Sequence, residues 1–487
     1  MKISNKKYKL FQLGWISITA IALLASCKKD LLDTVPQTTI SSATAYSTAA
    51  KIQAAVYGLY SGLQNGSFYG GRYVIFNEQR GDEFSQNDPN SATGAAVWGQ
   101  NVTASTDLVN NLWSQAFTTI NSANLLIDNI SNTTVIPDNV SSQYIGEAKF
   151  IRALSYFSLV QTFGQPYILD SNYLGLPLRL TGINSSGSNN LAFSSVATIY
   201  AQIIEDLNDA EATLPASYST ASLNAIRAHK AAAIALKTRV FLAQGNYTQV
   251  INEAQKLVPP AAPYKYANGT ALHKLEPTIA TIYSGSYTGP EAIFYIAFAN
   301  TTTETPASQS SLAYTYLGEP ILSLNPVGIV ANPVFSSSTD ARANLITTLS
   351  GQSLLKKFAI TTAPFSDYIP VIRYAEILLN YAEASANNND LPTATALLQA
   401  VRNRSDAGYT FPASAIATKD SLINTILTER RIELLGEGFR APDLLRRGQT
   451  LPAKSGAAGS APAIAPTANN YIWPTPSSET ADNTLAP

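Results

Sequence analysis

Residues 372–404 read IRYAEILLNYAEASANNNDLPTATALLQAVRNR and carry the clearest structural signal in this chain of 487 residues. In residues 372–386, apolar side chains recur at three- and four-residue steps, which is the period of an amphipathic helix. Four polar turn residues, 387–390, interrupt the pattern, and residues 392–404 resume it behind a proline. A polar break between two short periodic segments predicts a helical hairpin.

A second hairpin of the same kind is predicted at 227–244 and 247–257, joined at Gly245-Asn246. Both pairs have small residues near the crossing and an alanine-rich face, and they resemble tetratricopeptide helix pairs, which repeat about every 34 residues. Periodic apolar stripes predict further helices at 43–62, 107–130, 141–162, 195–213 and 417–435. The predicted fold is mainly α, a tetratricopeptide-like helix-pair superhelix with long irregular loops and little β.

Three segments lack this periodicity. Residues 63–105 contain Asn65-Gly66, Gly70-Gly71 and Asp88-Pro89, which are turn signals, so this segment is predicted to be a long irregular loop. Residues 262–366 are rich in Pro, Gly, Ser, Thr and Tyr, with one predicted strand at 291–298, and residues 450–487 are predicted to be mostly coil. Long loops in compact proteins are usually functional or disordered.

The chain begins like an exported protein. Lys2, Lys6, Lys7 and Lys9 precede an apolar run at 10–25, which ends at Leu24-Ala25-Ser26-Cys27 with the only cysteine in the sequence. This order is typical of a secretory signal peptide, and a cysteine at the cleavage point is typical of a bacterial lipoprotein. We therefore predict a signal peptide at 1–26, lipidation of Cys27 and a tether at 27–40. The apolar run is shorter than the roughly 20 residues of a spanning helix, although a transmembrane anchor and an unlipidated signal peptide remain alternatives.

Composition argues against nucleic-acid binding. The net charge is −1 and charged residues make up 13% of the chain, about half the usual share. Binding phosphates requires a basic surface, which this balance does not supply. The polar surface must instead consist of uncharged hydrogen-bonding side chains.

Signals for catalysis are scarce. The sequence contains no H-E-x-x-H, G-x-S-x-G or G-x-x-x-x-G-K motif, and its two histidines, His229 and His273, lie in unlike contexts. The carboxylate pairs Glu376/Glu383 and Glu429/Glu433 have arginines beside them, which favours charge-paired helix surface over a glycosidase pair. We predict no catalytic residue, no metal site and no cofactor, and nothing indicates a structural calcium ion.

Aromatic and polar residues in the irregular segments are better candidates for ligand binding. Sugars are held by stacking on Trp or Tyr while polar side chains reach their hydroxyl groups, and binding residues concentrate on loops borne by a rigid scaffold. Asp82, Glu83 and Asp88 are interpreted as solvated loop carboxylates, with binding of a cation or hydrogen bonds to a sugar as the alternative. The predicted ligand-binding residues are Tyr69, Arg72, Tyr73, Trp98, Asn101, Tyr314 and Tyr316.

Six segments together resemble the SusD/RagB family of outer-membrane nutrient-binding lipoproteins, and they occur in the order of that family. They are SCKKDLLD (26–33) with Pro36, EAKFIRA (147–153), RYAEILLNYAEA (373–384), VRNR (401–404), ERRIEL (429–434) with EGFR (437–440), and WPTP (473–476). Each segment is moderately specific alone, and together they span nearly the whole length of the chain, from residue 26 to residue 476.

The resemblance implies a SusD-like helical fold and a cell-surface lipoprotein of the outer membrane. It also implies the partners: an oligosaccharide or polysaccharide ligand, the membrane through a lipid anchor, and a SusC-like TonB-dependent transporter that receives the ligand. The motif residues Glu147, Arg152, Arg373, Glu376 and Glu383 are expected to join helices rather than to contact ligand. A binding lipoprotein for peptide or another nutrient, and a protein-binding helical scaffold, are the alternatives.

The expected organisation after the tether has three parts. They are an N-terminal SusD-like helical region at 41–261, an irregular ligand-face segment at 262–366, and a C-terminal SusD/RagB region with a coil tail at 367–487.

Overall fold

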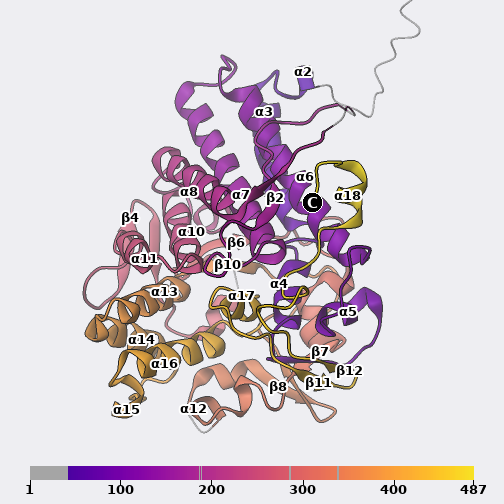
Figure 1. The fold of residues 1–487 in the computed structure, drawn as a ribbon. Coiled ribbons are helices and arrows are strands. Elements are labelled where there is room, and N and C mark those ends of the chain that lie inside the picture. The colour runs from indigo at the N-terminus through magenta and orange to yellow at the C-terminus, as the bar shows by residue number, and fades with distance from the viewer. Residues whose placement is uncertain (1–41, 186, 188, 285–286, 337–338) are drawn as a thin grey trace, which may run out of the picture. The chain divides into compact units, whose positions relative to one another are not determined.

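The computed structural model describes residues 42–487, apart from 186, 188, 285–286 and 337–338 (Figure 1). The signal peptide, Cys27 and the tether predicted from the sequence lie outside the described residues. The chain divides into a unit of residues 1–47, of which helix α2 (Ser42–Ala45) is described, and a unit of residues 48–487. The second unit is described by itself below.

Long helices form the frame of this unit, as the sequence predicts. They are α3 (Ala49–Gln64), α6 (Asp107–Ile130), α7 (Asp138–Phe163), α8 (Val196–Thr213), α10 (Lys230–Ala243), α11 (Tyr247–Ala254), α13 (Tyr374–Asn387), α14 (Leu391–Ser405) and α16 (Lys419–Glu433). Several of these helices start with a capping side chain: for example, those of Ser195, Asp390 and Thr418 each accept a hydrogen bond from the backbone of the first turn. The predicted mainly α fold is confirmed.

Neighbouring helices in the chain pack against each other. α7 packs on α6 and α8, α10 pairs with α11, and α13 pairs with α14, while α11 against α13 joins the two predicted hairpins (Figure 1). Gly245 ends α10 with a φ of 71°, a left-handed conformation that favours glycine. The frame is therefore an array of tetratricopeptide-like helix pairs.

The strands are short, and in the described part of the chain each pairs with one other strand, antiparallel. The pairs are β1 (Phe84–Gln86) with β7 (Leu322–Leu324), β2 (Leu174–Pro177) with β3 (Phe193–Ser195), β4 (Lys265–Asn268) with β5 (Ala271–Lys274), β6 (Ala292–Ile296) with β10 (Ile369–Arg373), β8 (Ile346–Leu349) with β9 (Gln352–Leu355), and β11 (Lys454–Gly456) with β12 (Gly459–Ala461). β6 confirms the strand predicted at 291–298. β10 leads directly into α13, so this pair positions the start of the C-terminal helices.

Short helices connect these elements. They are α4 (Arg72–Gln79), α5 (Ala95–Trp98), α9 (Ala221–Ile226), α12 (Pro333–Ser336), α15 (Ala413–Ile416), α17 (Arg440–Leu445) and α18 (Ser477–Asp482). Single turns of other helix types lie at Ser91–Thr93, Ile279–Tyr283, Ser308–Ser310, Tyr314–Gly318, Ile329–Ala331 and Ala341–Leu345.

The prediction that residues 63–105 form an irregular loop is wrong. The segment contains α4, β1 and α5, and all eight residues of α4 are buried. The turns predicted at Asn65-Gly66 and Gly70-Gly71 are present, since the backbone N–H of Gly70 donates to Asn65 O. Gly71 also allows a close approach, because a Cβ atom on it would lie 1.6 Å from the carbonyl oxygen of Ser310. Glycine here permits tight packing of two distant segments.

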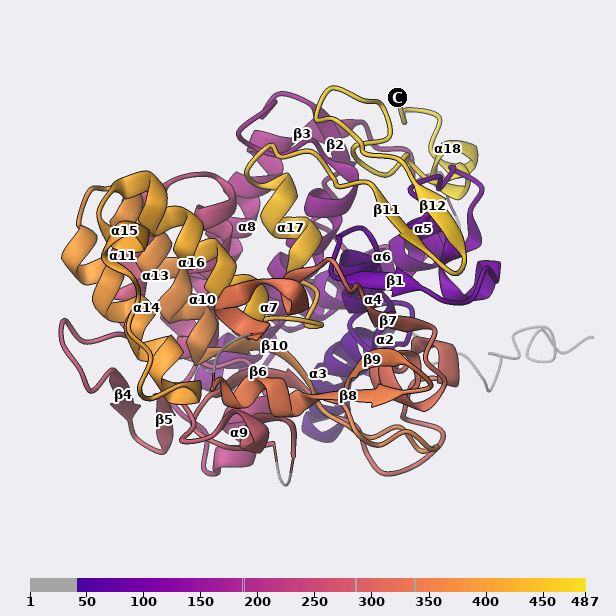
Figure 2. The same cartoon turned by 90° about the horizontal axis from the view of Figure 1, so that it is seen from below.

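The end of the chain returns to this segment (Figure 2). The Trp473 ring lies 5.5 Å from the Phe76 ring and 5.9 Å from the Phe163 ring, centroid to centroid. The Trp473 backbone N–H donates to Thr162 O at 3.0 Å, and Arg80 Nη2 donates to Tyr471 O at 2.9 Å. The tail predicted to be mostly coil is therefore part of the core.

Candidate functional site

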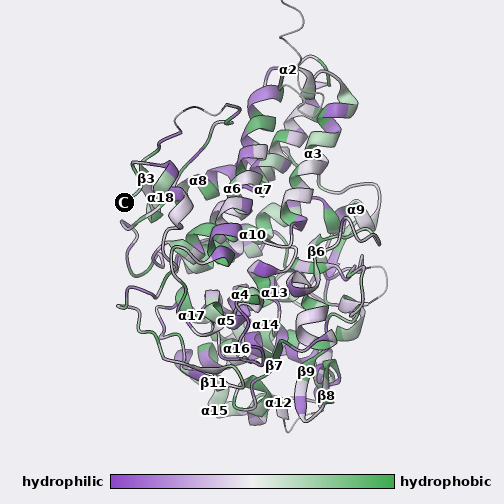
Figure 3. Cartoon of the chain, turned by 90° about the vertical axis from the view of Figure 1, so that its right-hand side faces the viewer, coloured by the Kyte–Doolittle hydropathy of each residue, from purple (hydrophilic) through white to green (hydrophobic). Residues whose placement is uncertain are grey.

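A cleft of about 330 Å³ opens between α3, α9 and β6, which lie side by side in Figures 2 and 3. This volume falls in the range of about 300–1,000 Å³ that is usual for ligand pockets. The cleft is lined by Tyr57, Tyr60, Ser61 and Gln64 of α3, by Leu223, Ile226 and Arg227, by Tyr295, Ile296 and Ala297, and by Glu304.

Helix α3 presents two different faces because of its sequence. Ile52, Val56, Leu59 and Leu63 form a buried apolar stripe with a helical period. A second face of α3 lines the cleft. Its residues follow one another at steps of three, one and three: Tyr57, Tyr60, Ser61 and Gln64. Burial of the first stripe therefore sets the orientation of the second.

An arginine is fixed at one wall of the cleft. Arg227 Nη2 donates to Glu147 Oε1 at 2.6 Å, and its Nε donates to Glu147 Oε2 at 3.1 Å. Its guanidinium carbon lies 5.7 Å from the Tyr57 ring centroid and 4.8 Å from that of Tyr218. Burial opposes the charge, but the Glu147 carboxylate outweighs this and raises the pKa of Arg227. The arginine therefore stays charged, and its charge is matched by Glu147.

The other polar groups of the cleft are mostly uncharged. The Tyr60 hydroxyl donates to Glu147 Oε2 at 2.5 Å, and Gln64 Nε2 donates to Ala297 O. Ser61 and Glu304 are exposed at the opening. Tyr57 is 49% exposed, so one part of its ring faces solvent although the guanidinium of Arg227 lies against it. The cleft thus combines an accessible aromatic ring with hydrogen-bonding groups.

Trp98, which the sequence places on an exposed loop, is buried at the end of α5. It is 2% exposed, its Nε1 donates to Phe84 O at 3.0 Å, and Lys454 Nζ lies 5.4 Å from its ring centroid. The expectation of an exposed ring is wrong, because strand β1 and the distant hairpin β11–β12 cover it.

Tyr69, Arg72 and Tyr73 are also buried. The Tyr69 hydroxyl is hydrogen-bonded to Ser158 Oγ at 2.9 Å, and the Tyr69 and Tyr73 rings are 4.9 Å apart. Arg72 Nη2 donates to Ala92 O at 2.6 Å. These side chains fill the space between α4 and α7 and do not lie on an open loop.

The three remaining predicted ligand-binding residues differ in their exposure to solvent. Tyr316 is buried and stacks on Phe84 with the ring centroids 5.0 Å apart. Tyr314 is half-buried, with its ring 5.8 Å from that of Phe365, and Asn101 is exposed. Only Asn101 and Tyr314 among the predicted residues reach solvent appreciably, and neither lines the cleft. The cleft was missed, although the aromatic and polar stripe of α3 was visible in the sequence.

The fold matches known structures closely. A solved SusD superfamily protein from Bacteroides fragilis superposes with a TM-score of 0.81 and is 30% identical, and the match covers 91% of this chain and 99% of that one. The chain belongs to the SusD family. Two family models match it, one described as the SusD family at residues 332–486 and one as "Starch-binding associating with outer membrane" at residues 30–242. The resemblance predicted from the sequence motifs is confirmed.

Further relatives extend over the same length. The SusD-like protein P2 of Formosa agariphila is 26% identical over 91% of this chain and 90% of its own. A solved structure described as a laminarin-binding SusD-like protein has a TM-score of 0.69 at 21% identity, and covers 91% of this chain and 99% of that one. At this identity, the similarity to the laminarin-binding protein is a similarity of fold.

The SusD-family motif residues join helices, as the resemblance implies. Arg152 pairs with Asp206 at 2.6 Å, Glu376 with Arg239 at 2.6 Å, and Glu383 with Arg446 at 2.6 Å. The prediction that the carboxylates lie on the helix surface is wrong, however, because Glu376, Glu383, Glu429 and Glu433 are all buried.

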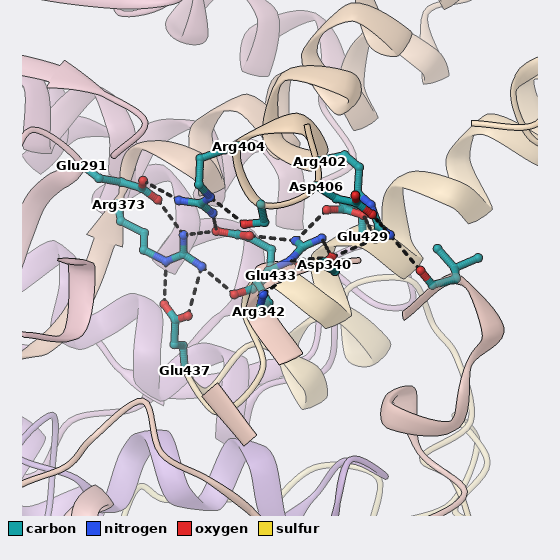
Figure 4. A network of polar contacts seen from close by, with 12 residues as sticks. Glu291, Asp340, Arg342, Arg373, Arg402, Arg404, Asp406, Glu429, Glu433 and Glu437 are labelled. Atoms are coloured by element: carbon teal, nitrogen blue, oxygen red, sulfur yellow. Dashed lines mark hydrogen bonds and ion pairs between the residues drawn. The ribbon is translucent and has the colours of Figure 1, made fainter. Parts of the chain in front are cut away.

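Glu433 lies at the centre of a buried ionic network (Figure 4). Its carboxylate is paired with Arg373 at 2.5 Å, with Arg342 at 2.8 Å and with Arg404. Burial alone would raise the pKa of Glu433, but the three arginines hold it well below its usual value. The carboxylate is therefore ionised and neutralised by arginine.

Two acidic residues of the supposed loop are ion-paired as well. Glu83 accepts from Arg431 Nε at 2.6 Å, and Asp82 accepts from Arg440 Nε at 2.5 Å. The interpretation of both as solvated carboxylates is wrong. Within the described ranges, no three His, Cys, Asp or Glu side chains gather into a set that could hold a metal ion.

Proposed function

We propose that this chain is a non-catalytic cell-surface protein that captures oligosaccharide or polysaccharide and delivers it to a SusC-like TonB-dependent transporter. The supporting observation is membership of the SusD family, since one matching family model is described as starch-binding and outer-membrane-associated. The laminarin-binding relative of the same fold points to the same ligand class. An uncharged polar surface suits a ligand that consists mainly of hydroxyl groups.

The proposal assigns ligand contacts to residues on accessible loops. Asn101 and Tyr314 reach solvent and are kept as ligand contacts. The other five predicted residues have buried side chains, so the proposal gives them a supporting role beneath the surface. They are Trp98, Tyr69, Arg72, Tyr73 and Tyr316.

The environment of the carboxylates supports the proposed non-catalytic role. Glycosidases need two carboxyl groups that face a sugar, one of them available as a proton donor. Glu429 and Glu433 are buried among arginines, and Glu383 accepts hydrogen bonds from Arg446 Nη1 at 2.7 Å and Arg447 Nη1 at 3.1 Å. None of the three has the exposure that this role requires.

Attachment to the membrane is proposed to occur through Cys27. Stable anchoring by lipid requires about two acyl chains, and a lipidated cysteine at the mature N-terminus would supply them. None of the helices in the described part of the chain combines the length and apolarity that crossing a bilayer requires. In membrane fractionation, Cys27→Ala should release the protein or leave it unprocessed, whereas a variant that stays firmly anchored would exclude lipid on Cys27 as the anchor.

Affinity electrophoresis tests glycan capture directly. The purified mature chain should be retarded in gels that contain soluble starch or laminarin, and no reducing ends should appear when it is incubated with either polysaccharide. Unretarded migration across a panel of glycans, with binding of peptides instead, would support the alternative nutrient. Release of sugars would contradict the non-catalytic assignment.

Delivery to a transporter has its own test. When an affinity-tagged chain is purified from detergent-solubilised outer membranes, a large TonB-dependent transporter should co-purify with it in stoichiometric amount. Recovery of the chain without such a partner would contradict this part of the proposal.

A further inference from the structure

We propose that the cleft between α3, α9 and β6 binds a short segment of a neutral glycan, with one sugar ring on Tyr57. This inference rests on the proposed function, to which it adds a site and a ligand class. It draws on the accessibility of Tyr57, on the way the ring is held, and on the charge balance of the cleft.

Tyr57 is the most exposed large aromatic side chain in the described part of the chain, at 49%. It lies beside a cavity, whereas Tyr173, at 38% exposed, does not line the cleft. Exposed aromatic rings next to a concave polar surface are typical of binding sites, because burial of the ring by ligand contributes favourably. The C–H face of a sugar ring is a suitable partner for such a ring.

The Tyr57 ring is positioned before any ligand arrives. The Arg227 guanidinium lies 5.7 Å from the ring centroid of Tyr57 and 4.8 Å from that of Tyr218, and it is itself fixed by two hydrogen bonds to Glu147. Glu147 is fully buried and also accepts from the Tyr60 hydroxyl. A side chain held in place loses less conformational entropy on binding, which favours affinity.

Hydrogen-bond donors and acceptors line the same cleft as the ring. Arg227 donates from Nε and Nη2 to Glu147. Among the described residues these are its side-chain hydrogen bonds, so the N–H groups of Nη1 can donate to a hydroxyl group of the ligand. The hydroxyl of Ser61 and the carboxylate of Glu304 lie at the opening. Sugar hydroxyl groups donate and accept, so this mixture of groups can satisfy them.

The charge balance favours a neutral ligand. Glu147 neutralises the one cation that lines the cleft, and Glu304 adds a negative charge at the opening. An anionic sugar would meet the Glu304 carboxylate without an unpaired cation to compensate. The volume of about 330 Å³ lies at the lower end of ligand pockets, which limits the bound part to a short segment.

Calorimetric titration of the purified chain with laminarin and with soluble starch tests the site. Tyr57→Ala should weaken binding about ten-fold, the order seen when a stacked aromatic ring is removed. Tyr57→Phe keeps the ring and should bind as the unaltered chain does, and Tyr173→Ala is the control for loss of an exposed tyrosine outside the cleft. Ser61→Trp, at an exposed position of α3, should occlude the cleft and abolish binding there.

The outcomes separate the two proposals. If the unaltered chain binds glycan and both Tyr57→Ala and Ser61→Trp bind equally well, the cleft is not the site, while the proposed function stands. If the unaltered chain binds neither these polysaccharides nor any other glycan, both fail. Tighter binding of alginate than of laminarin would overturn the neutral ligand class. Unchanged thermal unfolding of each variant shows that the fold is intact.

Discussion

At the scale of single residues, the buried charges depend on one another. The Glu433 carboxylate is shared by three arginines. One of them, Arg373, is also paired with Glu291 and with Glu437, each at 2.8 Å. Removing one member of such a set leaves charges in the interior without compensation. These residues therefore maintain the contact between β10, α14 and α16, and they are poor candidates for ligand contacts.

Glu433→Gln should lower the free energy of unfolding by about 3–5 kcal/mol, because three buried arginines lose a shared carboxylate. Urea denaturation measures this change. Asp209→Asn is the matched control, since Asp209 pairs with Lys149 at an exposed position, where the loss should stay below about 1 kcal/mol. Equal effects of the two substitutions would contradict a cooperative buried network.

The two histidines of the chain, which the sequence placed in unlike contexts, contact each other. The Nε2 atoms of His229 and His273 are 3.0 Å apart, and both side chains are buried. Burial lowers the pKa of His229 to about 3, with the neighbouring ring adding to the effect, and burial lowers that of His273 to about 4. Both imidazoles are therefore neutral in the folded protein at neutral pH.

A pH titration checks this pair. The unfolded state binds protons at its histidines near pH 6.5 while the folded state does not, so the contribution of the pair to stability is lost as pH falls from about 6.5 toward 4. By NMR, neither imidazole should titrate above about pH 5. The difference in unfolding free energy between the unaltered chain and His229→Gln isolates this contribution from that of the carboxylates. An imidazole that titrates near pH 6.5 would contradict the burial of the pair.

At the scale of elements, α3 packs one face in the core and lines the cleft with another, and its two glycines have different surroundings. A Cβ atom on Gly58 would meet nothing within 4 Å, whereas on Gly62 it would lie 2.7 Å from Thr119 Oγ1 of α6. Gly62 therefore permits the close approach of α3 to α6, and Gly58 has no such role.

Gly58→Ala should raise the free energy of unfolding by about 0.5–1 kcal/mol, because alanine restricts the unfolded chain and favours a helix. Gly62→Ala in the same helix should lower it by about 1–3 kcal/mol through overpacking against Thr119. Thermal or urea unfolding of the two variants gives the comparison. A stabilising Gly62→Ala would show that α3 and α6 are less tightly packed than described.

The elements that the sequence predicted best are those with a regular apolar stripe. α6 (Asp107–Ile130) begins and ends at the predicted residues, and α13, α14 and α16 lie within two residues of them at most ends. Residues 72–79 could not be recognised as a helix in this way, because RYVIFNEQ carries polar side chains on every face and all are buried. Several of their partners, such as Gly438 for Glu78 and Tyr471 for Arg80, lie hundreds of residues away, and local periodicity does not reveal them.

The candidate site was predicted less well for the same reason. Aromatic residues in glycine-rich segments suggested exposed platforms, but exposure depends on which distant segments pack above them. Trp98 is covered by Lys454, 356 residues later in the chain. Tyr57 falls within the helix predicted at 43–62, and only the placement of α9 and β6 beside α3 makes this face of the helix part of a cleft.

At the scale of the whole unit, the last residues of the chain pack against helices from its first third. The two matching family models cover separate stretches of sequence, yet the tail packs on α4 and α7, where Trp473 contacts Phe76 and Phe163. Glu78 of α4 accepts a hydrogen bond from the backbone of Gly438 at 2.7 Å. The two stretches therefore form one folding unit.

A chain that ends at Gln449 should fail to fold cooperatively, because it lacks Trp473 and the hydrogen-bond acceptor at Tyr471 for Arg80. Circular dichroism melting and limited proteolysis measure the loss. A chain that ends at Thr484 is the control, since it lacks only three residues, among them the exposed Leu485. A sharp melting transition in the shorter chain would contradict the role of the tail.

The return of the tail to α4 also sets when the protein can mature. Domains generally acquire structure from their N-terminal end while synthesis proceeds. Here Glu78, Gln79 and Arg80 are hydrogen-bonded to Gly438, Lys454 and Tyr471. A nascent chain that has not yet reached these residues holds the three polar groups without their partners. Completion of the native state must therefore await synthesis of the segment that ends at Tyr471, and until then the interior around α4 stays unfinished.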